Sequence, residues 1–190
     1  GVWSIMNRNS FRKMRIVGVE DGSFQKNVAK KALLVAVLVS GSKIEQVKAF
    51  RITVDGLDAT ERLYTNIRDW AFDVLLLSGV SFAGFNLIDP MRVFEVFGKP
   101  VIIVTRKRPN DKAVKRALQA HFEDWETRWA ILEKLGPVHK TVTLFGKQPI
   151  YFETVHADVQ WAVQLACSLA FWGRLPEPLR VARLVARGLS

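Results

Sequence analysis

The longest uninterrupted apolar run in the sequence is the eight residues from Ala32 to Val39, closed by the turn residues 40–42. The run is far too short to cross a membrane, and an apolar run bounded by turn residues is typical of a strand buried on both faces. The extended segment 44–54 follows after this three-residue loop, so the two segments are expected to pair as a hairpin. The chain is therefore expected to build its core on a β-sheet.

Other segments continue this pattern. An apolar strand over 15–19 stops at Glu20 and Asp21, and after the hairpin come a helix to Ala71, a strand at 74–77, a helix over 89–98 and a strand at 100–105. Beyond them the sequence predicts helices over 110–122, 124–135, 158–172 and 176–187 and a short hairpin at 140–145 and 150–153, with residues 1–13 irregular. This order predicts an α/β fold over a single domain, residues 1–190: a mixed sheet of about five strands flanked by helices, with a small C-terminal hairpin and helices.

Acidic residues follow the strands that are expected to run parallel. The meander makes the third strand parallel to the first, and helical crossovers join parallel strands, so four strands end at one edge of the sheet. That edge receives Glu20, Asp21, Asp55 and Asp58, together with the basic run 106–108. Carboxylates are ligands for magnesium, and magnesium can activate water against a phosphodiester. The same aspartates also suit turns and a helix cap at Asp58, so both interpretations stay open.

The chain carries a formal net charge of +10, which favours a polyanionic partner such as nucleic acid. The candidates for nucleic-acid contact are Arg106, Lys107, Arg108 and Lys112 from the densest basic cluster, and Phe82, Phe85 and Asn86 from the loop after the fourth strand. Arg180, Arg183 and Arg187 recur at helical spacing, and we interpret this stripe as a solvated face.

Several other kinds of chemistry lack their sequence signals. The three histidines have no metal-ligand spacing, and the single cysteine, Cys167, is expected to be a small core residue. No nucleophile-elbow serine and no phosphate-binding glycine loop is present. The N-terminal segment lacks the apolar stretch of a signal peptide, so we expect a soluble, cytoplasmic protein that does not contact membranes.

Three stretches give the sequence a family resemblance. They are Arg15 to Phe24, the segment from Phe72 to Pro109 with its Gly84-Phe85-Asn86 loop, and the Leu-Pro-Glu-Pro motif at 175–178. With the Val-Asp-Gly-Leu-Asp-Ala-Thr segment at 54–60 they resemble endonuclease V and, more closely, its archaeal relative, the endonuclease dU family. The order of elements is similar to a ribonuclease H-like fold.

This resemblance implies a metal-dependent endonuclease that nicks DNA at or near deaminated bases, deoxyuridine in particular, with magnesium or manganese as cofactor. It implies catalytic roles for Glu20, Asp21, Asp55, Asp58 and Asp158, and metal-binding roles for Glu20, Asp21, Asp55 and Asp158. Endonuclease V has an aspartate where this chain has Ser78, which puts the number of metal ions in question. The alternative is a ribonuclease H-like protein that binds nucleic acid but has lost catalysis.

Overall fold

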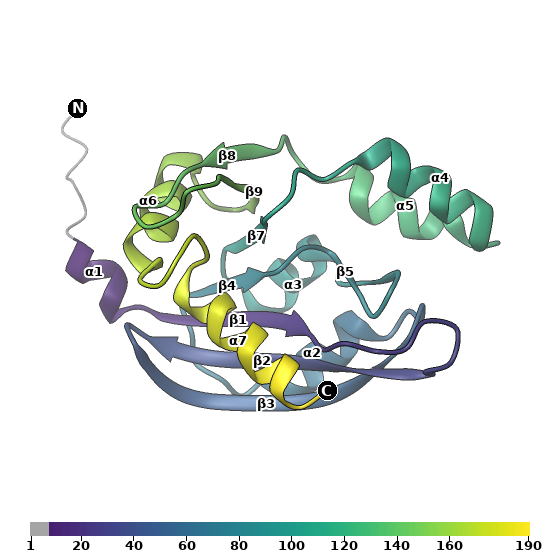
Figure 1. The fold of residues 1–190 in the computed structure, drawn as a ribbon, viewed down its shortest axis with the longest axis horizontal. Coiled ribbons are helices and arrows are strands. Elements are labelled where there is room, and N and C mark those ends of the chain that lie inside the picture. Colours follow the sequence, from purple (N-terminus) through teal and green to yellow (C-terminus); the bar gives the residue numbers. More distant parts are fainter. Residues whose placement is uncertain (1–7) are drawn as a thin grey trace.

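The computed structural model describes residues 8–190 (Figure 1). The irregular segment predicted for 1–13 was wrong over Arg8–Lys13, which form the helix α1. The rest of that prediction lies outside the described residues.

The main sheet has seven strands in the spatial order β3-β2-β1-β4-β7-β9-β8. These strands are β1 (Arg15–Asp21), β2 (Lys31–Ser40), β3 (Lys43–Thr53), β4 (Val74–Leu77), β7 (Val101–Thr105), β8 (His139–Thr141) and β9 (Ile150–Val155). A separate hairpin consists of β5 (Ser81–Phe82) and β6 (Asn86–Leu87). The helices are α2 (Ala59–Ile67), α3 (Pro90–Phe97), α4 (Asp111–His121), α5 (Trp125–Glu133), α6 (Val159–Leu169) and α7 (Glu177–Gly188).

Strand directions agree with the prediction. β2 pairs antiparallel with both β1 and β3, while β1, β4 and β7 pair parallel, so β1, β3, β4 and β7 end at a common edge. The loop between β2 and β3 has two residues rather than the expected three. The predicted C-terminal hairpin is present but is not a separate unit, because β9 pairs antiparallel with β7 and extends the sheet.

Helices cover both faces of the sheet because the strand residues alternate between them. Leu75 and Leu77 share one core with Leu63 of α2, whereas Leu76 packs in a second core with Leu165 of α6. α7 crosses β1 and β2 on the same side as α6 (Figure 1). Among residues 8–190, no helix has both the length and the apolar character needed to span a bilayer.

Gly18 sets the position of α7. A Cβ atom added at this residue of β1 would collide with the backbone oxygen of Pro178, so the start of the helix lies directly on the strand. Only glycine permits such a close approach between a helix backbone and a strand. The position of Gly18 and the Leu-Pro-Glu-Pro motif therefore fix which residues of α7 reach the end of β1.

Arg128 ties α5 to the edge of the sheet. This arginine is 5% exposed, and its Nη1 donates hydrogen bonds to the carbonyl oxygens of Gly56 (3.1 Å) and Phe85 (2.8 Å). Its Nε donates to Asp124 at 3.0 Å, and the guanidinium lies 4.1 Å from the centre of the Phe122 ring. The guanidinium thus connects α5 with the turn after β3 and with the β5–β6 turn.

Candidate nuclease site

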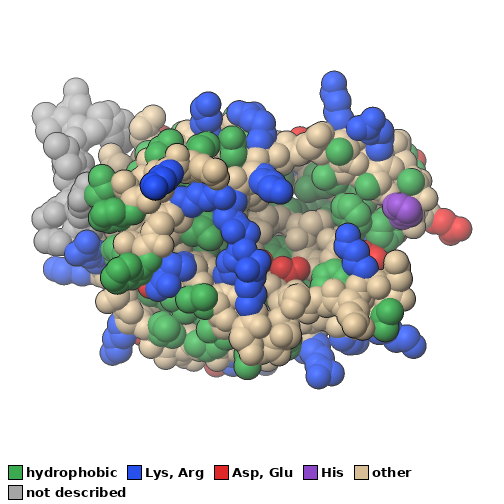
Figure 2. All heavy atoms as spheres, in the orientation of Figure 1, with side chains coloured by type: hydrophobic (Ala, Val, Ile, Leu, Met, Phe, Trp, Pro, Cys, Tyr) green, Lys and Arg blue, Asp and Glu red, His purple; other side chains and the backbone are tan. Residues whose placement is uncertain are grey.

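A basic cleft containing one glutamate lies where β1, β4 and β7 end. A cavity of about 510 Å³ there is lined by Glu20, Ser78, Arg106, Lys107, Arg174 and Arg183, among others. An adjoining cavity of about 270 Å³ shares Glu20, Arg106 and Arg183 and adds Asp21 and Arg187. We call the two cavities together the Glu20 cleft. Figure 2 shows basic side chains gathered over the middle of the α7 face, with little acidic surface between them.

Glu20 is a poorly solvated carboxyl group. Burial raises its pKa from 4.5 to about 7, and the neighbouring Asp21 adds to the rise. The Ser78 hydroxyl lies close enough to lower this pKa in part, yet Ser78 Oγ is buried without a hydrogen bond of good geometry among the described residues. The Asp21 backbone N–H donates to Glu20 Oε1 at 3.0 Å. The end of β1 therefore carries a carboxyl group whose ionised form is poorly stabilised by water.

Asp21 and Asp55 both hold the β5–β6 turn. The Ala83 backbone N–H donates to Asp21 Oδ2 at 2.8 Å, and the Phe85 backbone N–H donates to Asp55 Oδ1 at 2.9 Å. Asp55 itself has a left-handed backbone, with φ of 54°, and its N–H donates to the Ala83 carbonyl oxygen. Asp21 still lines the Glu20 cleft, whereas Asp55 lines a different cavity with Phe24 and Phe85. Asp55 thus makes the turn contacts that one of the two interpretations predicted, and it does not line the Glu20 cleft.

Asp58 is also engaged within the fold. It accepts hydrogen bonds from the Thr53 backbone N–H and hydroxyl and from Asn86 Nδ2. Burial acts to raise the Asp58 pKa, but the hydrogen bonds from Asn86 and Thr53 outweigh it and leave the pKa below its ordinary value. Asp58 precedes α2 as predicted, but the helix is capped by Asn86 Oδ1, which accepts from the Ala59 N–H at 3.0 Å. Asn86 is fully buried, so the expectation that it contacts nucleic acid fails.

Replacing Asn86 with alanine is expected to lower the free energy of unfolding by about 2 kcal/mol, because it leaves the Ala59 N–H without its acceptor and takes one of their donors from the Thr53 carbonyl and the Asp58 carboxylate. Urea unfolding followed by circular dichroism measures this loss. The control is Asn66→Ala, which removes one exposed bond within α2 and should cost far less. Equal stability of the two variants would contradict the role assigned to Asn86.

Asp158 lies at the opposite edge of the sheet from Glu20. Because β9 runs antiparallel to β7, its last residue, Val155, pairs with Val101 at the start of β7. Asp158 follows this end and caps α6 by accepting a hydrogen bond from the Trp161 N–H at 3.1 Å. The inference that Asp158 joins the carboxylates of β1 in one metal site was therefore wrong for this structure.

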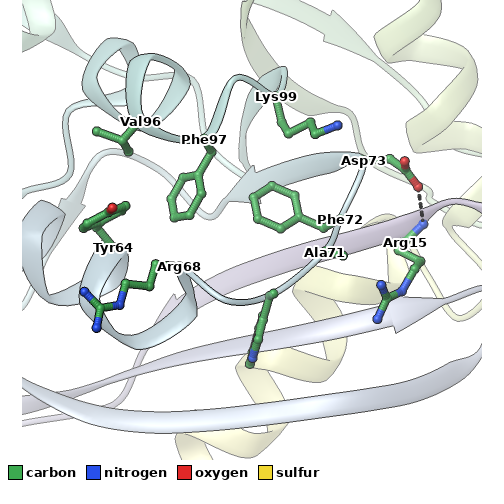
Figure 3. A pocket seen from close by; sticks show the side chains of 10 residues that line it. Arg15, Tyr64, Arg68, Ala71, Phe72, Asp73, Val96, Phe97 and Lys99 are labelled. Carbon is green, nitrogen blue, oxygen red and sulfur yellow. Dashed lines mark hydrogen bonds between the residues drawn. The ribbon is translucent and has the colours of Figure 1, made fainter.

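A cavity of about 410 Å³ occupies that opposite edge (Figure 3). Asp73 accepts a hydrogen bond from the Arg15 backbone N–H at 2.8 Å and is the one acid among the described residues of its lining. Phe72 and Phe97 lie edge to face between Arg68 and Lys99 in this view. Because the Asp73 carboxylate already accepts a hydrogen bond and no second carboxylate lines the described part of this cavity, the cavity does not offer a cation site.

The aromatic and basic candidates divide between the core and the surface. Phe82 is 1% exposed and cannot stack on a base without unfolding its loop, whereas Phe85 is half-buried against the Phe122 ring. Arg106 and Lys107 line the Glu20 cleft. Arg108 lies over the Tyr151 ring and lines a neighbouring cavity, and Lys112 is exposed on α4 outside the cleft.

Two arginines of the α7 stripe, half-buried Arg183 and exposed Arg187, also line the Glu20 cleft. Arg183 and Arg187 lie one helical turn apart, so they share the side of α7 that passes the end of β1. Arg180 does not line the cleft and pairs with Glu177 at 2.7 Å. Burial is the largest cause that lowers the Arg106 pKa, and the positive charges of Arg174 and Arg187 lower it further. These three cations therefore lie close enough to repel one another. An anion bound between them would relieve this repulsion.

Glu153 was not among the functional residues predicted from the sequence. Its position as a charged residue within a mainly apolar strand was the signal that could have identified it. It is 7% exposed on β9, and its side chain makes no hydrogen bond or ion pair within residues 8–190. It lines a cavity of about 370 Å³ together with Ser78, Lys107 and Asp111. Burial, and to a smaller extent Asp111, raises its pKa from 4.5 to about 7.

The Glu20 cleft fits one hard divalent cation better than two. Glu20 and Asp21 contribute carboxylates to the same cavity, and magnesium needs only one or two carboxylates when water and phosphate complete its coordination. Among residues 8–190 no group of three histidine, cysteine, aspartate or glutamate side chains could hold a metal ion. The unpartnered Ser78 hydroxyl offers a further oxygen beside Glu20.

Comparisons with known proteins show what this chain is similar to. The model of the family described as endonuclease dU matches residues 12–190. A UPF0215 protein of Pyrococcus furiosus is 36% identical over 187 residues, covering 95% of this chain and 94% of that protein. A solved protein of unknown function from Archaeoglobus fulgidus is 30% identical, with a TM-score of 0.81 over 93% of this chain and 98% of that one.

Ciona intestinalis endonuclease V, solved with DNA containing an inosine followed by a ribo-adenosine, is 14% identical with a TM-score of 0.59, over 93% of this chain and 85% of that one. This likeness concerns the fold and confirms the predicted ribonuclease H-like architecture. The match along nearly the whole sequence identifies the relationship: the chain belongs to the endonuclease dU family.

Proposed function

We propose that this protein is a metal-dependent endonuclease that nicks DNA at or near deaminated bases, with deoxyuridine as the leading lesion. The observation that carries the proposal is a half-buried, poorly solvated carboxyl group, Glu20, at the end of β1, in a cavity that Arg106, Arg183 and Arg187 also line. The description of the family and the inosine-containing DNA bound to Ciona endonuclease V support the substrate class. We also propose that the protein acts in the cytoplasm.

The arginines would bind the scissile phosphate and its neighbours. Guanidinium groups donate two parallel hydrogen bonds to phosphate oxygens, and in a poorly solvated cleft these bonds are stronger than in water. Arg174 is held in place because its Nη1 donates to Gln148 Oε1 at 3.1 Å and to the Pro149 carbonyl oxygen at 3.2 Å. The backbone of the DNA strand would therefore meet one preordered cation, Arg174, in the Glu20 cleft.

Glu20 and Asp21 would hold one magnesium or manganese ion. When bound, this ion would supply the Lewis acidity that activates water and stabilises the leaving oxygen. The hydrogen bond from Ala83 to Asp21 would keep that carboxylate oriented toward the cleft. A deaminated base would have to leave the stack to be inspected, and Phe85 is the aromatic candidate for contacting it, since Phe82 is buried.

A nicking assay tests the proposal. Duplexes carrying deoxyuridine, deoxyinosine or no lesion are incubated with magnesium, manganese or a chelator, and we expect cleavage only at the lesion and only with metal. The Arg183→Gln, Arg187→Gln double variant should bind DNA more weakly, with a salt dependence reduced by about one unit of slope per lost phosphate contact. Lys43→Gln with Arg92→Gln removes the same charge from exposed positions outside the cleft and serves as its control.

The second candidate is a nucleic-acid-binding protein without catalysis. It is favoured by Ser78, which stands where endonuclease V has an aspartate, and by the pair of carboxylates in the cleft in place of a larger set. DNA binding without cleavage under any metal would establish this candidate and overturn the enzyme.

A further inference from the structure

Four large apolar side chains project into solvent beside the Glu20 cleft. Val142, Leu144 and Phe145 follow β8 and are 58%, 64% and 62% exposed, and Trp172, between α6 and α7, is 74% exposed. We call these four residues the apolar knuckle. Such a concentration of exposed apolar side chains marks an interaction surface rather than an ordinary stretch of loop.

Specific contacts hold the knuckle in shape. Thr143 lies between its members but is 1% exposed, and its hydroxyl donates to the backbone oxygens of Gly173 (3.4 Å) and Arg174 (3.2 Å). The Gly146 N–H closes a turn onto the Thr143 carbonyl at 3.0 Å. A Cβ at Gly146 would lie 2.7 Å from Arg174 Cβ, so the turn packs directly on that residue. The two segments of the knuckle are therefore joined, and its apolar side chains are held outward.

Arg174 makes the knuckle continuous with the cleft. Its backbone anchors the knuckle through Thr143, while its side chain lines the Glu20 cleft with Arg106 and Lys107. A strand whose phosphates enter the cleft would thus pass Arg174 and meet an apolar and aromatic surface. In Figure 2 the part of the face near β8 and α6 shows apolar and basic side chains side by side.

We propose that the apolar knuckle stacks on unpaired bases of the DNA strand whose backbone lies in the Glu20 cleft. Aromatic side chains beside a basic groove are the usual platform for single-stranded nucleic acid, since every base has a π-face. A second copy of this chain is a poorer occupant because two proteins of charge +10 would bring basic surfaces together. The inference rests on the proposed function only in that it requires DNA to occupy the cleft.

The test measures binding without cleavage. The Phe145→Ala, Trp172→Ala double variant is compared with wild type in a chelator, by fluorescence anisotropy, on single-stranded DNA, on a duplex with a central unpaired bubble and on a fully paired duplex. Stacking contributes about 1–3 kcal/mol per base, so we expect affinity for the first two to fall about tenfold or more, and affinity for the paired duplex to change less than about twofold.

Two controls separate stacking from other effects. Ile44→Ala with Val47→Ala removes exposed apolar side chains from β3, at the other end of the sheet, and should bind like wild type. Trp172→Phe keeps an aromatic face and should retain most of the affinity.

Unchanged binding by the double variant, equal weakening on all three DNAs, or a dimer that dissociates on substitution would overturn the inference. If wild type binds no DNA, the proposed function fails as well, whereas wild-type binding with no effect of the variant overturns the knuckle alone.

Discussion

Replacing Glu20 with glutamine is expected to reduce metal-dependent nicking by about 10³-fold, equivalent to about 4 kcal/mol of transition-state stabilisation. Glutamine keeps the size of the side chain and the oxygen that accepts from the Asp21 N–H, but it cannot supply a negative charge. Single-turnover cleavage of a deoxyuridine duplex at saturating protein measures the loss. Binding in a chelator should stay the same or become tighter, because the variant removes an anion from a basic cleft.

The matched control is Glu61→Gln, which changes an exposed glutamate of α2 outside the cleft. Glu20 is a better target than Asp21 for this purpose, since alanine at Asp21 would also leave the Ala83 N–H without its acceptor. A loss of cleavage in the Asp21 variant could come either from a lost metal ligand or from a disturbed β5–β6 turn, and the assay would not distinguish the two causes. Nicking by Glu20→Gln at the wild-type rate would remove Glu20 from the proposed mechanism.

The second large effect concerns stability and pH. Burial raises the Glu153 pKa to about 7, so the native state favours the protonated form, whereas the unfolded chain ionises near 4.5. The contribution of Glu153 to stability is therefore fully present below pH 4.5 and is lost as the pH rises through about 7. Glu153→Gln should match wild type near pH 4 and be more stable by up to about 3 kcal/mol at pH 8.

Urea unfolding at a series of pH values measures this difference. Asp111, Lys107 and Arg108 line the same cavity, and high salt tests how much their charges contribute. Glu123→Gln, at an exposed position, should show no comparable pH dependence relative to wild type. A constant difference between Glu153→Gln and wild type from pH 4 to pH 8 would show that the carboxyl group does not titrate in this range.

The sheet could be predicted because its signals are local. Apolar runs bounded by glycine, serine and acidic residues defined β1, β2, β4 and β7, and the rules of strand connection gave their directions and their common edge. The pairing of β9 with β7 was not predictable, because it joins segments nearly fifty residues apart that carry no shared pattern. The helix at Arg8–Lys13 was missed because one short turn has little periodicity.

The meeting of candidate site residues could be predicted only where it depended on that common edge of the sheet. Glu20, Asp21, Arg106 and Lys107 meet there as expected. Asp55 and Asp58 could not be separated from them by spacing, since their hydrogen bonds come from the β5–β6 hairpin and Asn86. Arg183 and Arg187 depend on where α7 crosses β1, which Gly18 and Pro178 decide by steric contact. The position of Asp158 depended on the direction of β9, which the sequence left undetermined.

The buried guanidinium of Arg128 has a consequence for motion at this edge. One nitrogen of the guanidinium, Nη1, donates to the carbonyl oxygens of both Gly56 and Phe85. The turn after β3 and the β5–β6 turn are therefore coupled to each other through α5. If the β5–β6 turn opened while α5 stayed in place, the guanidinium, which is 5% exposed in the closed state, would keep a buried donor without its Phe85 acceptor, and an unsatisfied buried donor is costly. The turns around Gly56 and Phe85 and the helix α5 should consequently open as one cooperative unit, with similar protection of their amides against hydrogen exchange.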